Sequence, residues 1–341
     1  MNKLLGQENV KQRLKSSVIN KNVSHACIFE GEDGSGKKTF SEAYSMAIQC
    51  EKGTGEPCME CPSCIKALSR NHPDIIHVVH ERPNSIGVSE IRDQVVSDVM
   101  IKPYSSQYKI YIIAEAEKMT AEAQNALLKT LEEPPSYAVI MLLTNNILNL
   151  LPTIISRCVR FRLNPLDSGT VNRYLTEELN VDRYQAEMYT ALARGNLGRA
   201  KSLIGDESFN AIKDEASRLV KNIRELKMSR LSALVKLLDK NRVAAGNFLD
   251  ILLLWFRDVL MFKVTGLTDE LAFKEEVSEI KSEASDYSCE GLNKAIEAVE
   301  EARKRLNANV NFEMTIQLLA FEIRSSLIND PQGKSPAVQE K

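Results

Sequence analysis

The sequence has no excess of charge of either sign, because 44 lysine and arginine residues stand against 46 acidic ones. The formal net charge of −2 excludes a basic surface over the whole chain, so any contact with nucleic acid would need a local patch. Hydrophobic residues make up 43% of the chain and charged residues 26%, which is ordinary for a soluble globular protein. A length of 341 residues predicts about two or three domains, each with its own core.

Long hydrophobic runs are missing as well. The most apolar stretch, residues 248–264, contains Asp250, Arg257, Asp258 and Lys263, which favours a buried helix over a membrane span. The first residues lack the apolar core of a signal peptide. These absences predict a soluble, cytoplasmic protein that does not act at a membrane.

A phosphate-binding loop is the clearest functional motif that is present. The short apolar run 26–30 predicts a buried strand, and Gly31, Gly34, Gly36 and Lys37 follow it with the spacing G-x-x-x-x-G-K. Glycine lets the backbone wrap closely around an anion, and the N–H groups at the start of the next helix point at it. We therefore expect a nucleotide-binding loop that leads into a helix.

The magnesium ligands of such a site are missing from the sequence. The position after the loop lysine should carry a serine or threonine, but Lys38 occupies it, and Thr39 comes one residue late, about 100° around the helix. The apolar run that ends at Glu115 should carry an aspartate for Mg²⁺ before that glutamate, but Ala114 stands there. Because two independent positions for one metal are both lost, we expect hydrolysis to be lost or nearly lost, with Glu115 a relic.

Four of the seven cysteines lie inside one fifteen-residue segment that is rich in glycine and proline. They are Cys50, Cys58, Cys61 and Cys64. Thiolates at this spacing can close tetrahedrally around Zn²⁺, and a site with four protein ligands leaves no position for water, so it would be structural. Two disulfides are the alternative, which a reducing cytoplasm disfavours, and free thiols are another. His72 could replace one cysteine, although four cysteines make the simpler ligand set.

Strand and helix patterns alternate in the first half of the chain, which implies a mainly parallel sheet with helices on both faces. Asn145 follows the last predicted strand, at the edge where ligands bind in such sheets. Beyond residue 166 the strand pattern stops, and the remaining sequence is typical of helices. The strands are predicted over residues 26–30, 75–80, 109–115 and 139–143.

Several motifs together resemble the bacterial clamp-loader subunits, which are AAA+ proteins that open the sliding clamp and set it on primed DNA. They are Ser-His-Ala at 24–26, the phosphate loop, the cysteine insert, Asn-Ala-Leu-Leu-Lys-Thr-Leu-Glu-Glu-Pro-Pro at 125–135, and Ile-Ser-Arg-Cys at 155–158. The resemblance covers the whole chain and implies an α/β AAA+ core, a small helical lid and an all-α collar. The expected division is core 1–165 with the cysteine module 50–64, lid 166–206, collar 207–328 and a disordered tail 329–341.

The family contains ATP-hydrolysing motor subunits, gamma and tau, and a non-motor relative, delta-prime. Lys38 and Ala114 argue against the motor, and the sequence ends without the long extension of tau. The basic run 303–311 also resembles delta-prime. We therefore expect the non-motor kind, a subunit of the DNA polymerase III holoenzyme that is not catalytic by itself.

The resemblance also implies roles for single residues. Arg157 matches the arginine finger, which reaches the γ-phosphate bound by a neighbouring subunit, and without the surrounding motif a local salt bridge would be the preferred interpretation. Asn145 matches sensor 1 and Arg199 matches sensor 2, both as possible relics. ATP would bind weakly or not at all, since Lys37 and Lys38 could offset the missing Mg²⁺ charge or Lys38 could fill the pocket.

The implied partners are the gamma/tau and delta subunits, the sliding clamp indirectly, and primer–template DNA within the assembly. Two other functions are weighed against this one. A motor ATPase would need the missing magnesium ligands. A zinc-dependent nucleic-acid binder would need more basic and aromatic residues than Lys52 and Lys66 supply near the cysteines.

Overall fold

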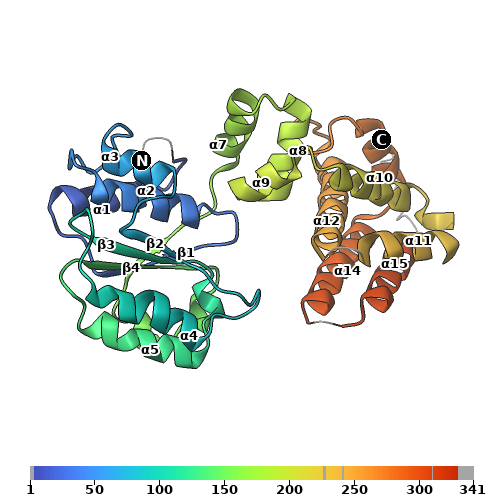
Figure 1. Cartoon of the computed structure of the whole chain (residues 1–341). Coiled ribbons are helices and arrows are strands. Elements are labelled where there is room, and N and C mark those ends of the chain that lie inside the picture. The colour runs from blue at the N-terminus through green and yellow to red at the C-terminus, as the bar shows by residue number, and fades with distance from the viewer. Residues whose placement is uncertain (1–3, 226–227, 240–241, 309, 329–341) are drawn as a thin grey trace. The chain divides into compact units, whose positions relative to one another are not determined.

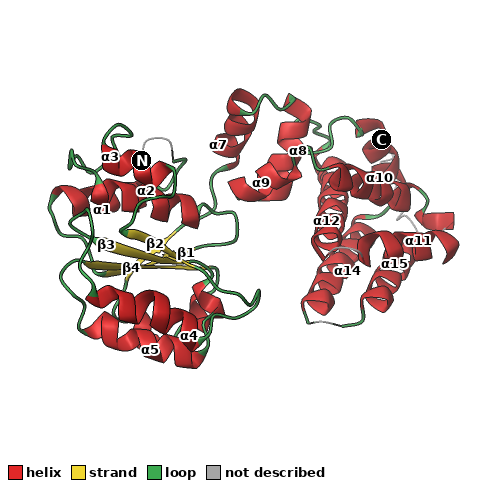
Figure 2. Cartoon of the chain, viewed as in Figure 1, coloured by secondary structure: helices red, strands yellow, loops and turns green. Residues whose placement is uncertain are grey.

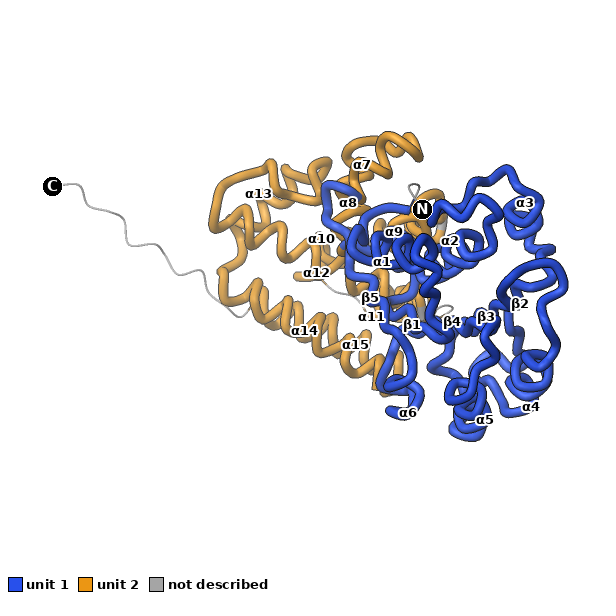
Figure 3. Tube along the Cα trace, turned by 90° about the vertical axis from the view of Figure 1, so that its left-hand side faces the viewer, with its two compact units in different colours: residues 1–170, 195–199 blue, residues 171–194, 200–341 orange. Residues whose placement is uncertain are grey.

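A computed structural model describes residues 4–225, 228–239, 242–308 and 310–328. The chain forms two compact units, one of Met1–Thr170 with Gly195–Arg199 and one of Val171–Arg194 with Ala200–Lys341 (Figure 3). Each unit is described by itself. The division into core, lid and collar stays a prediction, and the expected tail lies outside the described residues.

The first unit is built on a five-stranded sheet in which every pairing is parallel (Figure 2). The strand order is β2-β3-β4-β1-β5, so the strand before the phosphate loop lies between β4 and β5. This confirms the predicted mainly parallel sheet, although the sequence patterns predicted four strands and missed β5. The strands are β1 (Ala26–Glu30), β2 (Ile75–Val78), β3 (Lys109–Ile113), β4 (Ala138–Thr144) and β5 (Val159–Arg162).

Helices cover both faces of this sheet (Figure 1). Because side chains alternate along a strand, Cys27 and Phe29 pack with Leu14 and Tyr44 on one face, whereas Ile28 packs on the other face with residues of α4 and α5. Thr120 caps α5 by accepting a hydrogen bond from the Ala123 N–H at 3.2 Å. The helices are α1 (Glu8–Ile19), α2 (Lys37–Gln49), α3 (Pro62–Leu68), α4 (Val88–Ile91), α5 (Ala121–Glu132) and α6 (Pro152–Ile155).

The spacing of Val88, Ile91, Val95 and Val99 is that of an amphipathic helix, but the segment differs from a regular α-helix in its geometry. Only its first four residues are α-helical, and a π-helical segment over Arg92–Ser97 and a 3₁₀ turn over Asp98–Met100 follow. Ile91, Val95 and Val99 are nevertheless fully buried, as the pattern predicts. The apolar periodicity therefore identified the buried face of this segment, but it could not distinguish the wider π-helical turn from an α-helical one.

The rest of the chain is helical, which agrees with the loss of strand patterns after residue 166. In the second unit α12 packs against α10, α13 and α14, and its side chains Phe248, Leu252 and Phe256 are fully buried. No helix among the described residues is both long and apolar enough to cross a membrane. The helices are α7 (Ser168–Arg173), α8 (Arg183–Ala193), α9 (Leu197–Leu203), α10 (Glu207–Lys221), α11 (Met228–Asp239), α12 (Arg242–Thr265), α13 (Val277–Asp286), α14 (Cys289–Asn307) and α15 (Phe312–Ile328).

Candidate nucleotide loop, interface arginine and metal site

The predicted phosphate loop lies at the carboxyl end of β1 and leads into α2. Its first N–H, that of Gly31, donates to the carbonyl of Thr144 at the end of β4, over 3.1 Å. Gly34 and Gly36 have φ angles of 85° and 95°, in the left-handed region that favours glycine. The tight turn that the sequence predicts is therefore formed, at the sheet edge where ligands bind in parallel sheets.

The loop lysine is bound by the loop itself. The Nζ of Lys37 donates to the carbonyl of Gly31 at 2.6 Å and to that of Glu32 at 2.9 Å, and it lies 3.5 Å from a carboxylate oxygen of Asp33. Only 12% of this side chain is exposed. To bind a phosphate, the ammonium group would have to leave three acceptors that already satisfy its three donors.

Residues 195–199 lie against the same loop. The side-chain amide of Asn196 donates to the carbonyl of Asp33 at 2.6 Å, and the N–H of Gly198 donates to the carbonyl of Gly34 at 3.0 Å. A Cβ atom on Gly198 would lie only 2.5 Å from the Cα of Gly34, so the two backbones touch. Arg199 belongs to this segment, and its N–H donates to Oδ1 of Asn196.

Asn145 also reaches the loop. Its side-chain amide donates to a carboxylate oxygen of Asp33 at 3.3 Å, and its N–H donates to the carboxylate of Glu117. Lys38 and Thr39 are both exposed. The loop, Asn145 and the segment of Arg199 therefore lie together, and several of their polar groups bind one another.

The carboxylate of Glu115 is bound by neighbouring side chains of the same unit. It adopts a left-handed backbone with φ of 51°, and Lys118 binds one of its oxygens at 2.6 Å. The other oxygen lies 3.4 Å from Nε2 of His80, whose Nδ1 contacts the carbonyl of Arg82. Both carboxylate oxygens therefore have neighbours, and Ala114 adds no ligand for a metal, which suits a relic.

Arg157 lies in the turn between α6 and β5. Its Nη2 atom pairs with Oε1 of Glu132 at 2.7 Å, and Nη1 donates to the carbonyl of Thr153 at 2.9 Å and to Oγ of Ser156 at 3.3 Å. The side chain is 35% exposed. Arg157 therefore forms a local salt bridge, which was the alternative interpretation of this residue from the sequence. Its guanidinium is still partly exposed to solvent.

The sheet register places this arginine far from the chain's own phosphate loop. Val159, two residues after Arg157, pairs with Cys27 near the amino end of β1, whereas the loop follows Glu30 at the carboxyl end. Five strand residues at about 3.3 Å each separate the two edges of the sheet by about 17 Å. If Arg157 acts on a nucleotide, that nucleotide is not bound by this loop.

The four clustered cysteines converge as a metal site would require. Their sulfur atoms all lie within 4.8 Å of one another, and those of Cys58 and Cys64 are 3.9 Å apart. A tetrahedral zinc with Zn–S bonds of about 2.3 Å places its sulfurs about 3.8 Å apart. None of the four forms a disulfide. The donor set therefore fits Zn²⁺ or a similar thiophilic ion.

Backbone groups favour the thiolate form of one of these cysteines. Hydrogen bonds from the N–H groups of Glu60 and Cys61 lower the pKa of Cys58 to about 6, whereas burial raises the pKa of Cys64 to about 12. His72 is not a member of the cluster. Its Nδ1 accepts from the N–H of Asp74 at 3.1 Å, and its Nε2 lies 3.1 Å from Oγ of Ser63. Both ring nitrogens are thus engaged, which favours the set of four cysteines.

Comparison with known proteins identifies the chain's relatives. A family model described as DNA polymerase III, delta subunit, matches residues 6–167, and one described as its C-terminal part matches residues 213–323. The chain is 31% identical over 331 residues to DNA polymerase III subunit delta' of Bacillus subtilis, which spans 95% of this chain and 97% of that protein. The chain belongs to the family of DNA polymerase III clamp-loader subunits.

Other relatives in the clamp-loader family are tau and gamma subunits. The tau subunit of Bacillus subtilis is 30% identical over 306 residues, which span 83% of this chain but 54% of tau. A crystal structure of a gamma subunit-related protein from Thermotoga maritima aligns over 93% of this chain and 99% of that one, at 21% identity and a TM-score of 0.47. That likeness is too low to carry an argument. Sequence identity of about 30% to both a delta' and a tau subunit does not by itself show which of the two kinds this chain is.

Sequence patterns did not predict several partners of the candidate site residues, which are His80 and Lys118 beside Glu115, Asn196 on the phosphate loop and Glu132 beside Arg157. Lys118 stands three residues after Glu115 and could have been considered for that reason. His80 and Asn196 are distant in sequence from the groups they bind. No local pattern marks such contacts.

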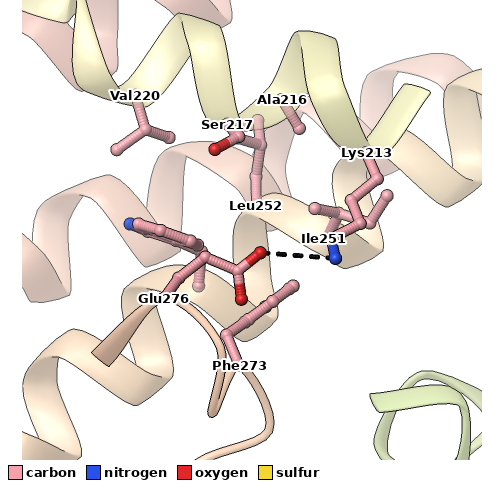
Figure 4. A pocket seen from close by; sticks show the side chains of 9 residues that line it. Lys213, Ala216, Ser217, Val220, Ile251, Leu252, Phe273 and Glu276 are labelled. Atoms are coloured by element: carbon pink, nitrogen blue, oxygen red, sulfur yellow. Dashed lines mark ion pairs between the residues drawn. The ribbon is translucent and has the colours of Figure 1, made fainter. Parts of the chain in front are cut away.

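A cavity of about 10 Å³ lies between α10, α12 and the segment before α13, with room for about one water molecule (Figure 4). Lys213 and Glu276 form an ion pair of 3.3 Å beside it. Its other lining residues are mostly apolar, and we interpret the cavity as a packing defect of the helical unit.

Proposed function

We propose that this clamp-loader subunit is of the non-motor, delta-prime kind and presents Arg157 to ATP bound by a neighbouring gamma or tau subunit. The position of Arg157 carries the proposal. It is half-exposed at the sheet edge opposite the chain's own phosphate loop, so its guanidinium is available to another subunit and not to its own site. An arginine finger typically accelerates hydrolysis about 10³–10⁵-fold by stabilising charge on the transferred phosphoryl group.

The state of the chain's own loop supports the non-motor assignment. Lys37 binds loop carbonyls, and Asn196 and Gly198 bind the loop from the other side. Lys38 and Ala114 stand where magnesium ligands belong. We infer that the chain binds ATP weakly or not at all and does not hydrolyse it.

We also infer that the four-cysteine site holds a structural Zn²⁺. All four ligands are protein side chains, which leaves no position for water or substrate. The ion would therefore hold the loop 50–64 against the ends of α2 and α3 and would take no part in ATP hydrolysis. In the proposed role in DNA replication, the chain assembles with the gamma/tau and delta subunits. It acts indirectly on the sliding clamp and contacts primer–template DNA inside the loader. The proposed location is the cytoplasm.

Two measurements test the non-motor assignment on the isolated chain. A calorimetric titration with ATP, with and without Mg²⁺, is expected to show weak uptake or none, and a turnover assay is expected to show no hydrolysis above background. Turnover by the chain alone would overturn the assignment and make the motor interpretation correct.

A further inference from the structure

Among the described residues, Glu132 is the acidic side chain that pairs with Arg157. It is the last residue of α5, and its Oε1 lies 2.7 Å from Nη2 of Arg157 in an ion pair whose side chains are 49% and 35% exposed. Helices α5 and α6 are in contact, so the pair joins the end of α5 to the turn after α6. Three elements of the first unit thus fix the guanidinium.

The place of Glu132 is unfavourable for the helix itself. The carboxyl end of a helix carries partial negative charge and favours cations, yet both Glu132 and Glu133 stand there. Helix stability therefore does not explain a carboxylate at position 132. The contact with Arg157 does, because it brings a positive charge to that helix end.

The arrangement leaves donors for a further acceptor. A guanidinium has five N–H groups. Among the contacts of the described residues, Nη1 serves Thr153 and Ser156, while Nη2 serves Glu132 with one of its hydrogens. The Nε–H and the second Nη2–H remain, so Arg157 could meet a phosphate oxygen without leaving Glu132.

We propose that Glu132 is a positioning residue for Arg157, and this inference rests on the proposed function of Arg157 as a finger. A free arginine side chain loses much rotamer entropy when it is fixed on a phosphate. The ion pair with Glu132 fixes the planar group before the neighbouring subunit arrives. Since half-exposed ion pairs are weak, removing this one should lower turnover about 2- to 5-fold.

The test is steady-state ATP turnover by a loader reconstituted with the Glu132→Gln chain, in the presence of clamp and primed DNA. We expect kcat to fall about 2- to 5-fold with KM unchanged, since the finger acts on the transition state. Glu133→Gln is the matched control, because it removes the same charge from the same helix end but not from Arg157. That variant should turn over ATP like the unaltered loader. Thermal melting of both variants checks that the fold is intact.

A double substitution separates positioning from a merely structural role. If Glu132 acts through Arg157, adding Glu132→Gln to Arg157→Ala causes no further loss. Equal turnover by Glu132→Gln and Glu133→Gln would overturn the inference, and so would a further loss in the Arg157→Ala background. Failure of the proposed function looks different, because then Arg157→Ala itself would leave turnover unchanged.

Discussion

A buried carboxyl group in the second unit gives a prediction whose size follows from the structure. Glu283 on α13 is only 8% exposed, and the indole N–H of Trp255, the one tryptophan of the chain, donates to its Oε2 at 2.8 Å. Burial disfavours the ionised form and raises the pKa of Glu283 from 4.5 to about 7. The folded unit therefore keeps a proton on Glu283 at pH values where the unfolded chain has lost it.

The direction of the effect follows from proton linkage. Below pH 4.5 both states are protonated, and the stabilising contribution of Glu283 is fully present. As the pH rises toward 7, the unfolded state binds fewer protons than the folded state, so the free energy of unfolding falls. With the pKa moving from 4.5 to about 7, the loss between pH 5 and pH 8 is about 2.5 kcal/mol.

Urea unfolding followed by the fluorescence of Trp255 measures this loss, because the only tryptophan lies in the second unit. Replacing Glu283 by glutamine, which cannot ionise, should remove about 2.5 kcal/mol of pH dependence between pH 5 and pH 8. Glu279→Gln is the control. Hydrogen bonds from Ser278 and Lys221 lower the pKa of Glu279 to about 2, so it affects stability only in more acidic solution. An unchanged pH profile in Glu283→Gln would refute the reasoning.

Two further predictions concern the first unit. Replacing Cys61 by serine should leave less than one zinc per chain in metal analysis of the purified protein, whereas the unaltered chain should carry one. Full zinc retention would contradict the four-cysteine ligand set. Gly198→Ala should destabilise the first unit by about 1–3 kcal/mol, because the new methyl group meets the backbone of Gly34, and a thermal melt measures the loss. In Gly169→Ala the new methyl meets no backbone atom and only Oδ1 of Asp167, at 3.2 Å, so the loss in the melt should be smaller than for Gly198→Ala.

The sequence predicted the parts of the fold that local patterns encode. Short apolar runs predicted strands β1 to β4, and their alternation with helix patterns predicted the parallel arrangement. The spacing of Cys50, Cys58, Cys61 and Cys64 predicted a cluster that the structure forms. In each case the pattern lies within a short segment of the sequence, either as a run of apolar residues or as the spacing of metal ligands.

Contacts between distant segments could not be predicted in this way. The bonds from Asn196 to the loop at Asp33 and from Glu132 to Arg157 join residues far apart in sequence, and they depend on how the elements pack. The π-helical turn after Ile91 escaped because a spacing of four suits it as well as an α-helix. The roles given to Arg157, Asn145 and Arg199 stay predictions, since geometry alone does not measure activity.

The most direct test of the account is ATP turnover, stimulated by clamp and primed DNA, in a loader reconstituted with the Arg157→Ala chain. Arg160→Ala is the matched control, because Arg160 is also an exposed arginine paired with a glutamate, Glu30, at 2.8 Å. With assembly intact, the account predicts that Arg157→Ala lowers turnover by about an order of magnitude or more, whereas Arg160→Ala does not. Unchanged turnover in Arg157→Ala would mean that Arg157 is only a local ion pair and would contradict the account.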